Sequence, residues 1–526
     1  MTGGLLRTTP APRRPEVFDR AYATKIMIIL AGLVTTVMYI EGMLTPSLPT
    51  IARDFSVAPS QVSLVLSVYL VTGVALSPVF GKLGDIYGKK HVLTAVLVAY
   101  TVAVSVTGFS PNFEFMVVAR AVQGIGLTLF PLAMSLVREE FPREMVPRAQ
   151  GTLSALFGAG FAISLPLGSF VSNDYGWRTT YHSAIPFVVA ITIACFFLLR
   201  ESPYRRPETR IDVAGASLLG AALALLVLGL SEGPSWGWSS TPVLAMMLVG
   251  AALLLPLVVI ERRLFARGRE VILDLRLLKI RNVMVANIVV LISGLGMFLA
   301  MLALTYQLQN PLRAGGYDLS IVQTGLCLLP FAVGMLIFAP IASVFVVRFG
   351  TKPLTVIGSL VGAVGFFLAT LVTTLPALLL VMLVVGAGLA IMNASVINLL
   401  VLTVEPRDMG LGTSMNAVFR NMGSAIGAPI AGSLMATYLV FLPIPPQYYF
   451  PDVTAFYWCF ITAAVLFLAA AGVTLFAREI LGRRALTIVA QPTGSSGRTG
   501  VPGAEASGRV STAGSSDTSS RPSGAG

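Results

Sequence analysis

Charged residues are scarce in this chain: Asp, Glu, Lys and Arg together make up 11% of its 526 residues. A soluble domain carries about 25% charged residues, which cover its surface. Hydrophobic residues make up 55% of the chain, and apolar runs recur from Lys25 to Arg478. Because a run of roughly twenty apolar residues spans a bilayer, this composition excludes a soluble globular protein and indicates a membrane protein.

Cysteine and histidine are also rare, with three and two residues. Cys195, Cys327 and Cys459 lie singly within apolar runs, without the spacing of metal ligands or of a disulfide framework. The sequence has no nucleotide-binding P-loop. We therefore expect no cofactor, no bound metal, no enzymatic activity and no direct use of ATP.

Acidic residues are fewer than basic ones, which gives a formal net charge of +12. If the N-terminus is cytoplasmic, all but five of the 36 Lys and Arg fall in cytoplasmic loops and tails. The exceptions are Arg53, Arg178 and Arg313 outside, and Arg120 and Arg420 within apolar runs. Such a bias sets membrane topology, so we expect a multi-pass plasma-membrane protein with both termini cytoplasmic, and no nucleic acid as a partner.

Fourteen apolar runs are long enough to cross a bilayer, which predicts an all-α polytopic membrane protein. The predicted spans cover residues 25–45, 60–80, 91–110, 115–137, 149–172, 181–199, 213–231, 242–261, 283–307, 320–345, 354–373, 376–402, 411–438 and 454–477. The four Trp, at positions 177, 236, 238 and 458, fall at the outer ends of spans, where an indole ring prefers the interface.

An internal repeat divides the spans into two halves. A shift of 262 residues superimposes three pairs of identical residues: Pro78 on Pro340, Gly88 on Gly350 and Lys90 on Lys352. Transporters are commonly built from such repeats, with the substrate site between them. The shift makes two six-helix bundles and leaves the two middle spans as an inserted hairpin. The predicted parts are a cytoplasmic segment at 1–24, the first bundle at 25–200, the hairpin and its connectors at 201–281, the second bundle at 282–484 and a Gly/Ser-rich, disordered cytoplasmic tail at 485–526.

The loop between the second and third spans reads Gly-Lys-Leu-Gly-Asp-Ile-Tyr-Gly-Lys-Lys over residues 81–90. Through Gly81, Asp85, Gly88, Lys89 and Lys90 it resembles the corresponding loop of the major facilitator superfamily. From about residue 25 to 480 the chain looks like the fourteen-span drug:proton antiporter branch of that family, with two six-helix bundles and an added helix pair.

A carboxylate such as Asp85 can accept hydrogen bonds from the N–H groups at a helix N-terminus. The resemblance implies that this helix belongs to the other half, around residues 409–413, and that the contact closes the cytoplasmic side. The alternative is that the basic residues of this gating loop only set topology.

Three polar residues within the first-half spans are candidates for proton coupling and substrate binding. Arg120 is expected to face the interior of the bundle, with Gln123 one turn further on, or else to snorkel to the outer headgroups. Glu41 is expected to be a lone carboxylate whose neutral form is favoured by desolvation, which suits proton exchange or neutralisation of a cation. The resemblance implies that an acidic residue near Glu41 couples transport to protons.

Small residues line the fifth span, where Gly158, Ala162 and Pro166 recur every four residues and Gly168 follows. A stripe of this kind lets another helix pack closely. It is similar to a motif that marks exporters in the family, although Leu165 stands where the family has glycine.

On the thirteenth span, Asn416, Arg420 and Asn421 precede a glycine-rich stretch that resembles the matching helix of the branch. These three residues are the second-half candidates. The sequence thus predicts a secondary transporter that exchanges protons for amphipathic or cationic compounds by alternating access, as a monomer in the lipid bilayer. A proton-coupled transporter of a dedicated metabolite and a nontransporting membrane receptor remain alternatives.

Overall fold

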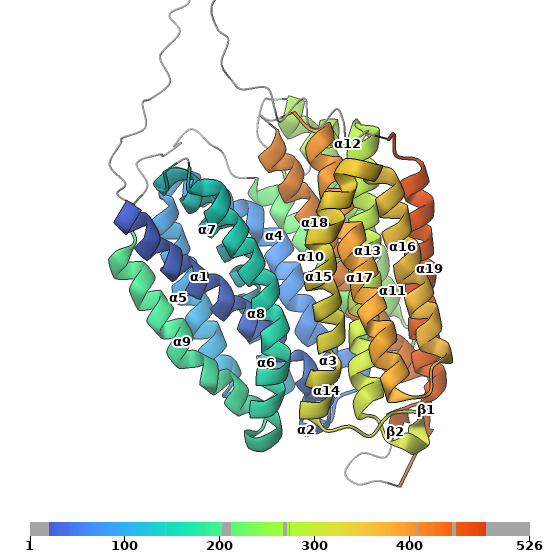
Figure 1. The fold of residues 1–526 in the computed structure, drawn as a ribbon. Coiled ribbons are helices and arrows are strands. Elements are labelled where there is room, and N and C mark those ends of the chain that lie inside the picture. Colours follow the sequence, from blue (N-terminus) through green and yellow to red (C-terminus); the bar gives the residue numbers. More distant parts are fainter. Residues whose placement is uncertain are drawn as a thin grey trace, which may run out of the picture. The chain divides into compact units, whose positions relative to one another are not determined.

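The structure, a computed structural model, describes residues 20–142, 144–201, 212–266, 271–272, 274–405, 408–443 and 449–479. Most of the predicted N-terminal segment and the whole predicted tail lie outside these residues. The long helices run alternately up and down (Figure 1), so their ends gather at two levels. We call the level that carries Gly88 and Gly350 the basic end, and the level that carries Trp177 and Trp458 the aromatic end.

The first six spans include two broken ones. The first span breaks after Gly42, where Pro46 lacks the N–H that a continuing helix needs. The fourth span tightens into a 3-10 turn at Gly124. The elements are α1 (Arg20–Gly42), η1 (Thr45–Ser47), α2 (Leu48–Asp54), α3 (Pro59–Val62), α4 (Leu64–Tyr87), α5 (Lys89–Thr107), α6 (Phe113–Gln123), η2 (Gly124–Thr128), α7 (Leu129–Glu140), α8 (Val146–Tyr175) and α9 (Trp177–Leu198).

The hairpin and the second bundle follow. The hairpin consists of α10 (Val213–Trp236) and α11 (Thr241–Ala266). The second bundle consists of α12 (Leu275–Lys279), α13 (Arg281–Gln309), η3 (Leu312–Ala314), α14 (Ile321–Cys327), α15 (Leu329–Phe349), α16 (Thr351–Leu371), α17 (Leu375–Thr403), α18 (Met409–Thr437) and α19 (Val453–Leu475). A short antiparallel pair, β1 (Leu439–Phe441) and β2 (Tyr449–Pro451), joins α18 to α19 with Val440 opposite Phe450.

Among the described residues, thirteen helices or helix runs are long and apolar enough to cross a membrane. The predicted span that is not among these thirteen is the one at residues 411–438, which forms α18; this helix has 29 residues but is less apolar because it carries Asn416, Arg420 and Asn421. It packs along α13 and contacts α4 and α10, so protein surrounds much of its length. The predicted architecture of two six-helix bundles with an inserted two-helix hairpin is confirmed.

The internal repeat is visible at the start of the third span of each bundle. Gly88 and Gly350 have φ angles of 103° and 93°, a conformation that glycine adopts readily. The Glu201 carboxylate, just after α9, accepts hydrogen bonds of 3.3 and 3.2 Å from two backbone N–H groups at the start of α5. Glu479, just after α19, does the same for α16 at 3.1 and 3.2 Å. The last span of each bundle therefore caps the third span of that bundle, where the helix dipole favours a negative charge.

One seam between the bundles lies along α18. Gly410, Asn421 and Gly432 of this helix share a face, because they are eleven residues, or about three turns, apart. A Cβ atom on Gly432 would lie 2.7 Å from the carbonyl oxygen of Pro59 in the first bundle, whereas one on Gly410 would have no neighbour within 4 Å. This seam is closed at the aromatic end and open at the basic end.

The other seam lies along α8 and has the same form. Ser169 packs so closely on Gly325 of α14 that a Cβ atom on Gly325 would collide with it. Gly158, three turns earlier on the same face of α8, has open space where a Cβ would stand. The bundles thus separate toward the basic end, and we call the space between Gly158 and Gly410 the interbundle opening.

The hairpin covers only the seam along α18. Its first helix, α10, packs against both α4 and α18 (Figure 1). Near the aromatic end, the Ser433 hydroxyl donates to the Leu230 carbonyl oxygen at 2.5 Å, and the Ser63 and Ser231 hydroxyls lie 3.3 Å apart. The hairpin is therefore bonded to both bundles at the end where they meet.

Candidate functional site

Glu41 and Arg120 form an ion pair inside the first bundle, with 3.2 Å between Glu41 Oε2 and Arg120 Nη2. Glu41 is the last residue but one of α1, beside the break in the first span. Arg120 lies in the last turn of α6, just before the 3-10 turn of the fourth span. Both side chains are buried, with exposed fractions of 9% and 1%. The two breaks therefore bring the acid and the base together within the span region.

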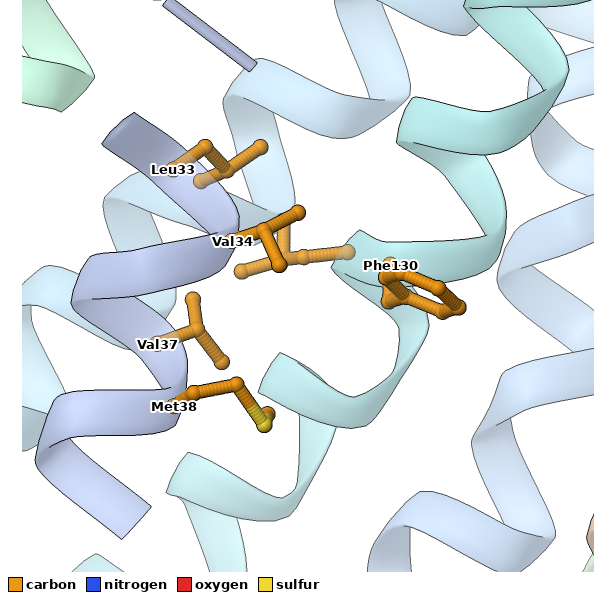
Figure 2. A pocket seen from close by; sticks show the side chains of 6 residues that line it. Leu33, Val34, Val37, Met38 and Phe130 are labelled. Atoms are coloured by element: carbon orange, nitrogen blue, oxygen red, sulfur yellow. The ribbon is translucent and has the colours of Figure 1, made fainter. Parts of the chain in front are cut away.

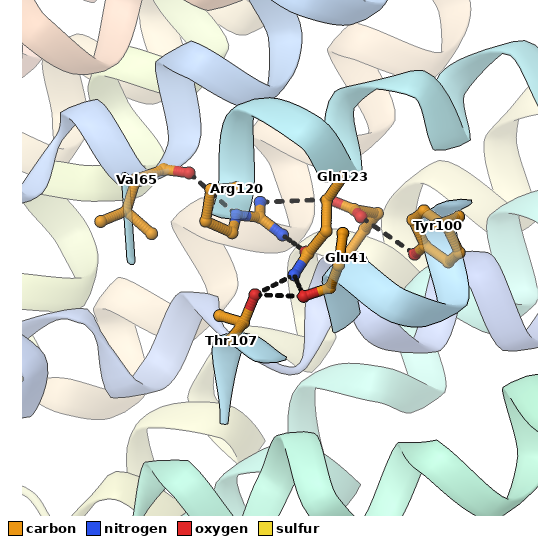
Figure 3. Close-up of polar contacts among 7 residues, drawn as sticks. Glu41, Val65, Tyr100, Thr107, Arg120 and Gln123 are labelled. Carbon is orange, nitrogen blue, oxygen red and sulfur yellow. Dashed lines mark hydrogen bonds and ion pairs between the residues drawn. The ribbon is translucent and has the colours of Figure 1, made fainter. Parts of the chain in front are cut away.

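The remaining donors of Arg120 are also satisfied (Figure 3). Its Nε donates to the Val65 carbonyl oxygen at 3.0 Å, and its Nη1 donates to Gln123 Oε1 at 2.8 Å. Gln123 in turn donates to the Thr107 hydroxyl at 2.5 Å. The predicted trio of Glu41, Arg120 and Gln123 thus meets in one network that ties together α1, α4, α5 and α6.

Two tyrosines that the sequence analysis missed complete this network. The Tyr100 hydroxyl donates to Glu41 Oε1 at 3.3 Å, and the Arg120 guanidinium lies 4.7 Å from the centre of the Tyr69 ring. Gly124 and Gly126 make room for them, since a Cβ on Gly124 would collide with the Tyr69 backbone and one on Gly126 with the Tyr100 ring. The glycines after Gln123 therefore let the aromatic side chains reach the ion pair.

One expectation about this pair was wrong, and one alternative is excluded. Glu41 is not a lone carboxylate, because it has Arg120 and Tyr100 as partners. Arg120 does not snorkel to the headgroups, since its side chain is 1% exposed and all its bonds point into the bundle. The sequence showed each residue on its own helix, whereas the contact depends on how α1 and α6 are rotated toward each other.

The gating loop lies at the basic end and connects to its own bundle. Asp85 pairs with Lys89 Nζ at 3.4 Å, and the same amine bonds to Glu139 of α7. Gly81 has open space beside it. Among the described residues, Asp85 makes no hydrogen bond or ion pair with the start of α18, so the predicted closure is not formed in this arrangement.

The small-residue stripe of α8 differs from the predicted one. Gly160, Ser164 and Gly168 are buried against α1, and a Cβ on Gly168 would lie 2.5 Å from the Met43 Cα. Gly158 is exposed at the interbundle opening, while Ala162 and Pro166 are half-buried. The prediction of close packing was right for Gly168 and wrong for Gly158, while for the half-buried Ala162 and Pro166 it stays a prediction.

The three second-half candidates have different surroundings. Asn416 is buried and donates to Asn287 of α13 at 3.3 Å, so it joins two helices of one bundle. Asn421 is half-buried and Arg420 is exposed. Among the described residues, no carboxylate pairs with Arg420. Of the three, Arg420 is the one whose side chain is free to meet a ligand.

A small apolar pocket lies between α1 and α7 (Figure 2). Its lining consists of Leu33, Val34, Val37, Met38, Leu129 and Phe130, and the space between these side chains is too small to hold a water molecule. These apolar side chains therefore pack the two helices together and do not form a ligand site.

The fold and these sites identify the class of protein. The sequence profile of the Major Facilitator Superfamily matches residues 30–309 and 286–495 of this chain. The chain belongs to this superfamily, as its loop at residues 81–90 indicated, and is a multi-pass membrane transporter.

Its relatives include two named exporters. The multidrug transporter protein MdtP of Bacillus subtilis (strain 168) is 24% identical over 422 residues, which cover 78% of this chain and 76% of MdtP. The tetracenomycin C resistance and export protein of Streptomyces glaucescens is 24% identical over 443 residues, which cover 82% of this chain and 79% of that protein. Among solved structures, the xylose transporter XylE from E. coli has the same fold, with a TM-score of 0.57, 15% identity, and coverage of 87% of this chain and 98% of XylE.

Proposed function

We propose that this protein is a proton-coupled exporter of amphipathic drugs or toxic compounds that works by alternating access. The observation that carries the proposal is the buried pair of Glu41 and Arg120, a group that can take up a proton within the membrane. The names of the relatives MdtP and the tetracenomycin C export protein support the direction and the class of substrate.

The proposed coupling follows from competition between a proton and Arg120 for the Glu41 carboxylate. Separating the partners of a buried ion pair costs about 3–5 kcal/mol, so the paired state holds α1 and α6 together. A proton on Glu41 removes its charge and weakens the bond to Arg120, which keeps its bonds to Val65 and Gln123. Each unit of pH difference supplies about 1.4 kcal/mol per proton, so matching this cost takes a difference of about two to four pH units for one proton, or about one to two units for two protons.

The proposed topology places the basic end in the cytoplasm of a plasma-membrane protein, with both termini on that side. The interbundle opening then faces the cytoplasm and admits substrate from inside the cell. The proposed domain limits are 25–200, 201–281 and 282–484, and the two bundles rock about the closed aromatic end within a single chain. A contact between Asp85 and the start of α18 would close the cytoplasmic side in the opposite state.

The test is Glu41→Gln in proteoliposomes with an imposed pH gradient. Glutamine keeps the shape of the side chain and an oxygen that accepts from Arg120, but it cannot take up a proton. We expect loss of uphill accumulation of a fluorescent amphipathic dye, with exchange of dye for dye retained. Glu232→Gln is the matched control, because Glu232 lies in the hairpin and its partner is Gln61. Uphill accumulation by Glu41→Gln under a pH gradient alone would show that coupling resides elsewhere.

A further inference from the structure

Arg420 lies at mid-depth in the molecule. It is the twelfth of the 29 residues of α18, about 16 Å along the helix from Met409 at ~1.5 Å per residue. Its backbone packs on Gly294, the fourteenth of the 29 residues of α13, so closely that a Cβ on Gly294 would collide with the Arg420 carbonyl oxygen. Both helices therefore place this arginine halfway between the two ends.

The Arg420 side chain nevertheless meets open space. The exposed residues of the first half of α18 are Gly410, Thr413, Ser414 and Arg420. They form one arc of the helix, between the side that packs on α13 and the side that carries Gly432 against the first bundle. Arg420 thus lies on the wall of the interbundle opening.

The Arg420 guanidinium is a positive charge that no carboxylate of the described residues neutralises. Among the described residues away from the ends of the spans, the other charges are Glu41 and Arg120, which lie nearer the aromatic end and neutralise each other. The earlier expectation of a cationic substrate rested on a free Glu41, and that carboxylate is already occupied. A free cation in the wall repels cationic ligands and attracts anionic ones.

The chemistry of arginine specifies the ligand. An intramembrane arginine is costly unless water or an anion satisfies its donors, and Arg420 has no carboxylate partner among the described residues. The planar guanidinium presents a fork of N–H donors that matches a carboxylate or sulfonate in a bidentate manner. An anion bound there therefore accepts strong, charge-assisted hydrogen bonds.

We propose that Arg420 binds the anionic group of an amphipathic organic anion, and that this protein prefers carboxylate- or sulfonate-bearing substrates over cationic ones. The proposal rests on the proposed function, since it names the charge of the substrate that the transporter carries. It assigns to α18 the recognition of substrate charge and leaves proton uptake to the first bundle.

The test uses three dansyl compounds that differ in the charge of one end: dansylglycine, dansylglycinamide and dansylcadaverine, which are anionic, neutral and cationic. Binding to the full-length protein in nanodiscs is measured by fluorescence. A hydrogen bond to a charged group contributes enough to change affinity by about ten- to hundredfold. We expect wild-type protein to bind dansylglycine at least tenfold more tightly than the amide, and Arg420→Gln to lose this preference while its affinity for the amide stays unchanged.

Three further variants control for charge, size and folding. Arg313→Gln removes an equal charge from the closed aromatic end and should leave the preference intact. Ala417→Glu, three residues before Arg420 on the same arc, supplies an internal carboxylate and should abolish dansylglycine binding, whereas Ala417→Gln of equal size should not. If Arg420→Gln does not fold, the Ala417 pair decides the question, because neither variant removes the arginine.

The outcomes separate this inference from the proposed function. Equal preference for dansylglycine in wild type, Arg420→Gln and Ala417→Glu, with proton-driven dye export intact, would overturn the anion site alone. A preference that disappears in both variants, in a protein that shows no pH-driven transport of any of the three dyes, would support the anion site and refute proton-coupled export.

Discussion

Gly432 offers the sharpest test of how the two bundles meet. It packs against the first bundle, where an added Cβ would lie 2.7 Å from both the Pro59 carbonyl oxygen and the Ser60 Cα. These are backbone atoms of α3, which cannot move aside as a flexible side chain would. Gly432→Ala should therefore open the seam at the aromatic end and shift the protein away from the arrangement that is open at the basic end.

The size of the shift follows from the cost of overpacking. Forcing a methyl group into a packed contact costs about 1–3 kcal/mol. The contact of Gly432 with the first bundle exists when the aromatic end is closed and not when it is open, so the whole cost acts on the equilibrium between these two arrangements. This cost changes the equilibrium constant about 5- to 150-fold. The gain in helix propensity from Gly to Ala occurs in both arrangements and cancels. Gly410→Ala, on the same face with nothing within 4 Å, is the matched control.

The assay is the labelling rate of a cysteine at position 414 by a membrane-impermeant maleimide. Ser414 is exposed at the interbundle opening, whereas Cys195, Cys327 and Cys459 are buried. We expect Gly432→Ala to slow labelling of Ser414→Cys in proportion to the loss of the open arrangement, and Gly410→Ala to leave the rate unchanged. Equal rates in Gly432→Ala and the parent protein, with both folded, would refute the seam as the pivot.

Two further predictions concern glycines whose Cβ would collide with a neighbouring side chain. Gly126→Ala should displace the Tyr100 ring from Glu41 and destabilise the protein by about 1–3 kcal/mol. It should also reduce proton-driven transport more than Tyr100→Phe does, because Tyr100→Phe removes only one hydrogen bond. Gly88→Ala and Gly350→Ala should each cost about 1–3 kcal/mol, because the residue must hold a positive φ and its Cβ collides with Glu201 or Glu479. Thermal unfolding followed by a thiol-reactive dye reports both, since the three native cysteines are buried. Melting temperatures equal to that of the parent protein would contradict the packing at these glycines.

The architecture could be read from the sequence because each span carries its own signal. A run of about twenty apolar residues predicts a helix without knowledge of its neighbours. The repeat of Gly88 at Gly350, from which two halves were predicted, corresponds to two helix starts with the same positive φ. These features are local, so they do not depend on the packing of distant helices.

The contacts within the site depend on rotation and could not be read in the same way. Glu41 and Arg120 are 79 residues apart, and nothing in either helix alone fixes the angle at which it faces the other. The stripe of α8 shows the same limit, since Gly158 and Gly160 both begin a four-residue repeat of small residues. Only the packing against Met38 and Met43 of the first span selects the second stripe.

The breaks in the spans were partly foreseeable. Pro46 is a local signal for a break in the first span. The turn at Gly124 is not, because its cause is the closeness of Tyr69 and Tyr100 on two other helices. The residue types were visible in the sequence, but the reason for the glycines lies in their neighbours.

The inserted hairpin gives the two seams unequal access to lipid. Helix α10 lies over the junction of α4 and α18, so acyl chains do not reach that side of the interbundle opening. On the opposite side, α8 meets α14 and α15, where Ile163, Leu167 and Leu326 are exposed. Within the part of the chain that the structure describes, no helix covers that junction. Among the described helices, a molecule dissolved in the membrane would therefore meet the hairpin on one flank and the uncovered seam between α8 and α14 on the other.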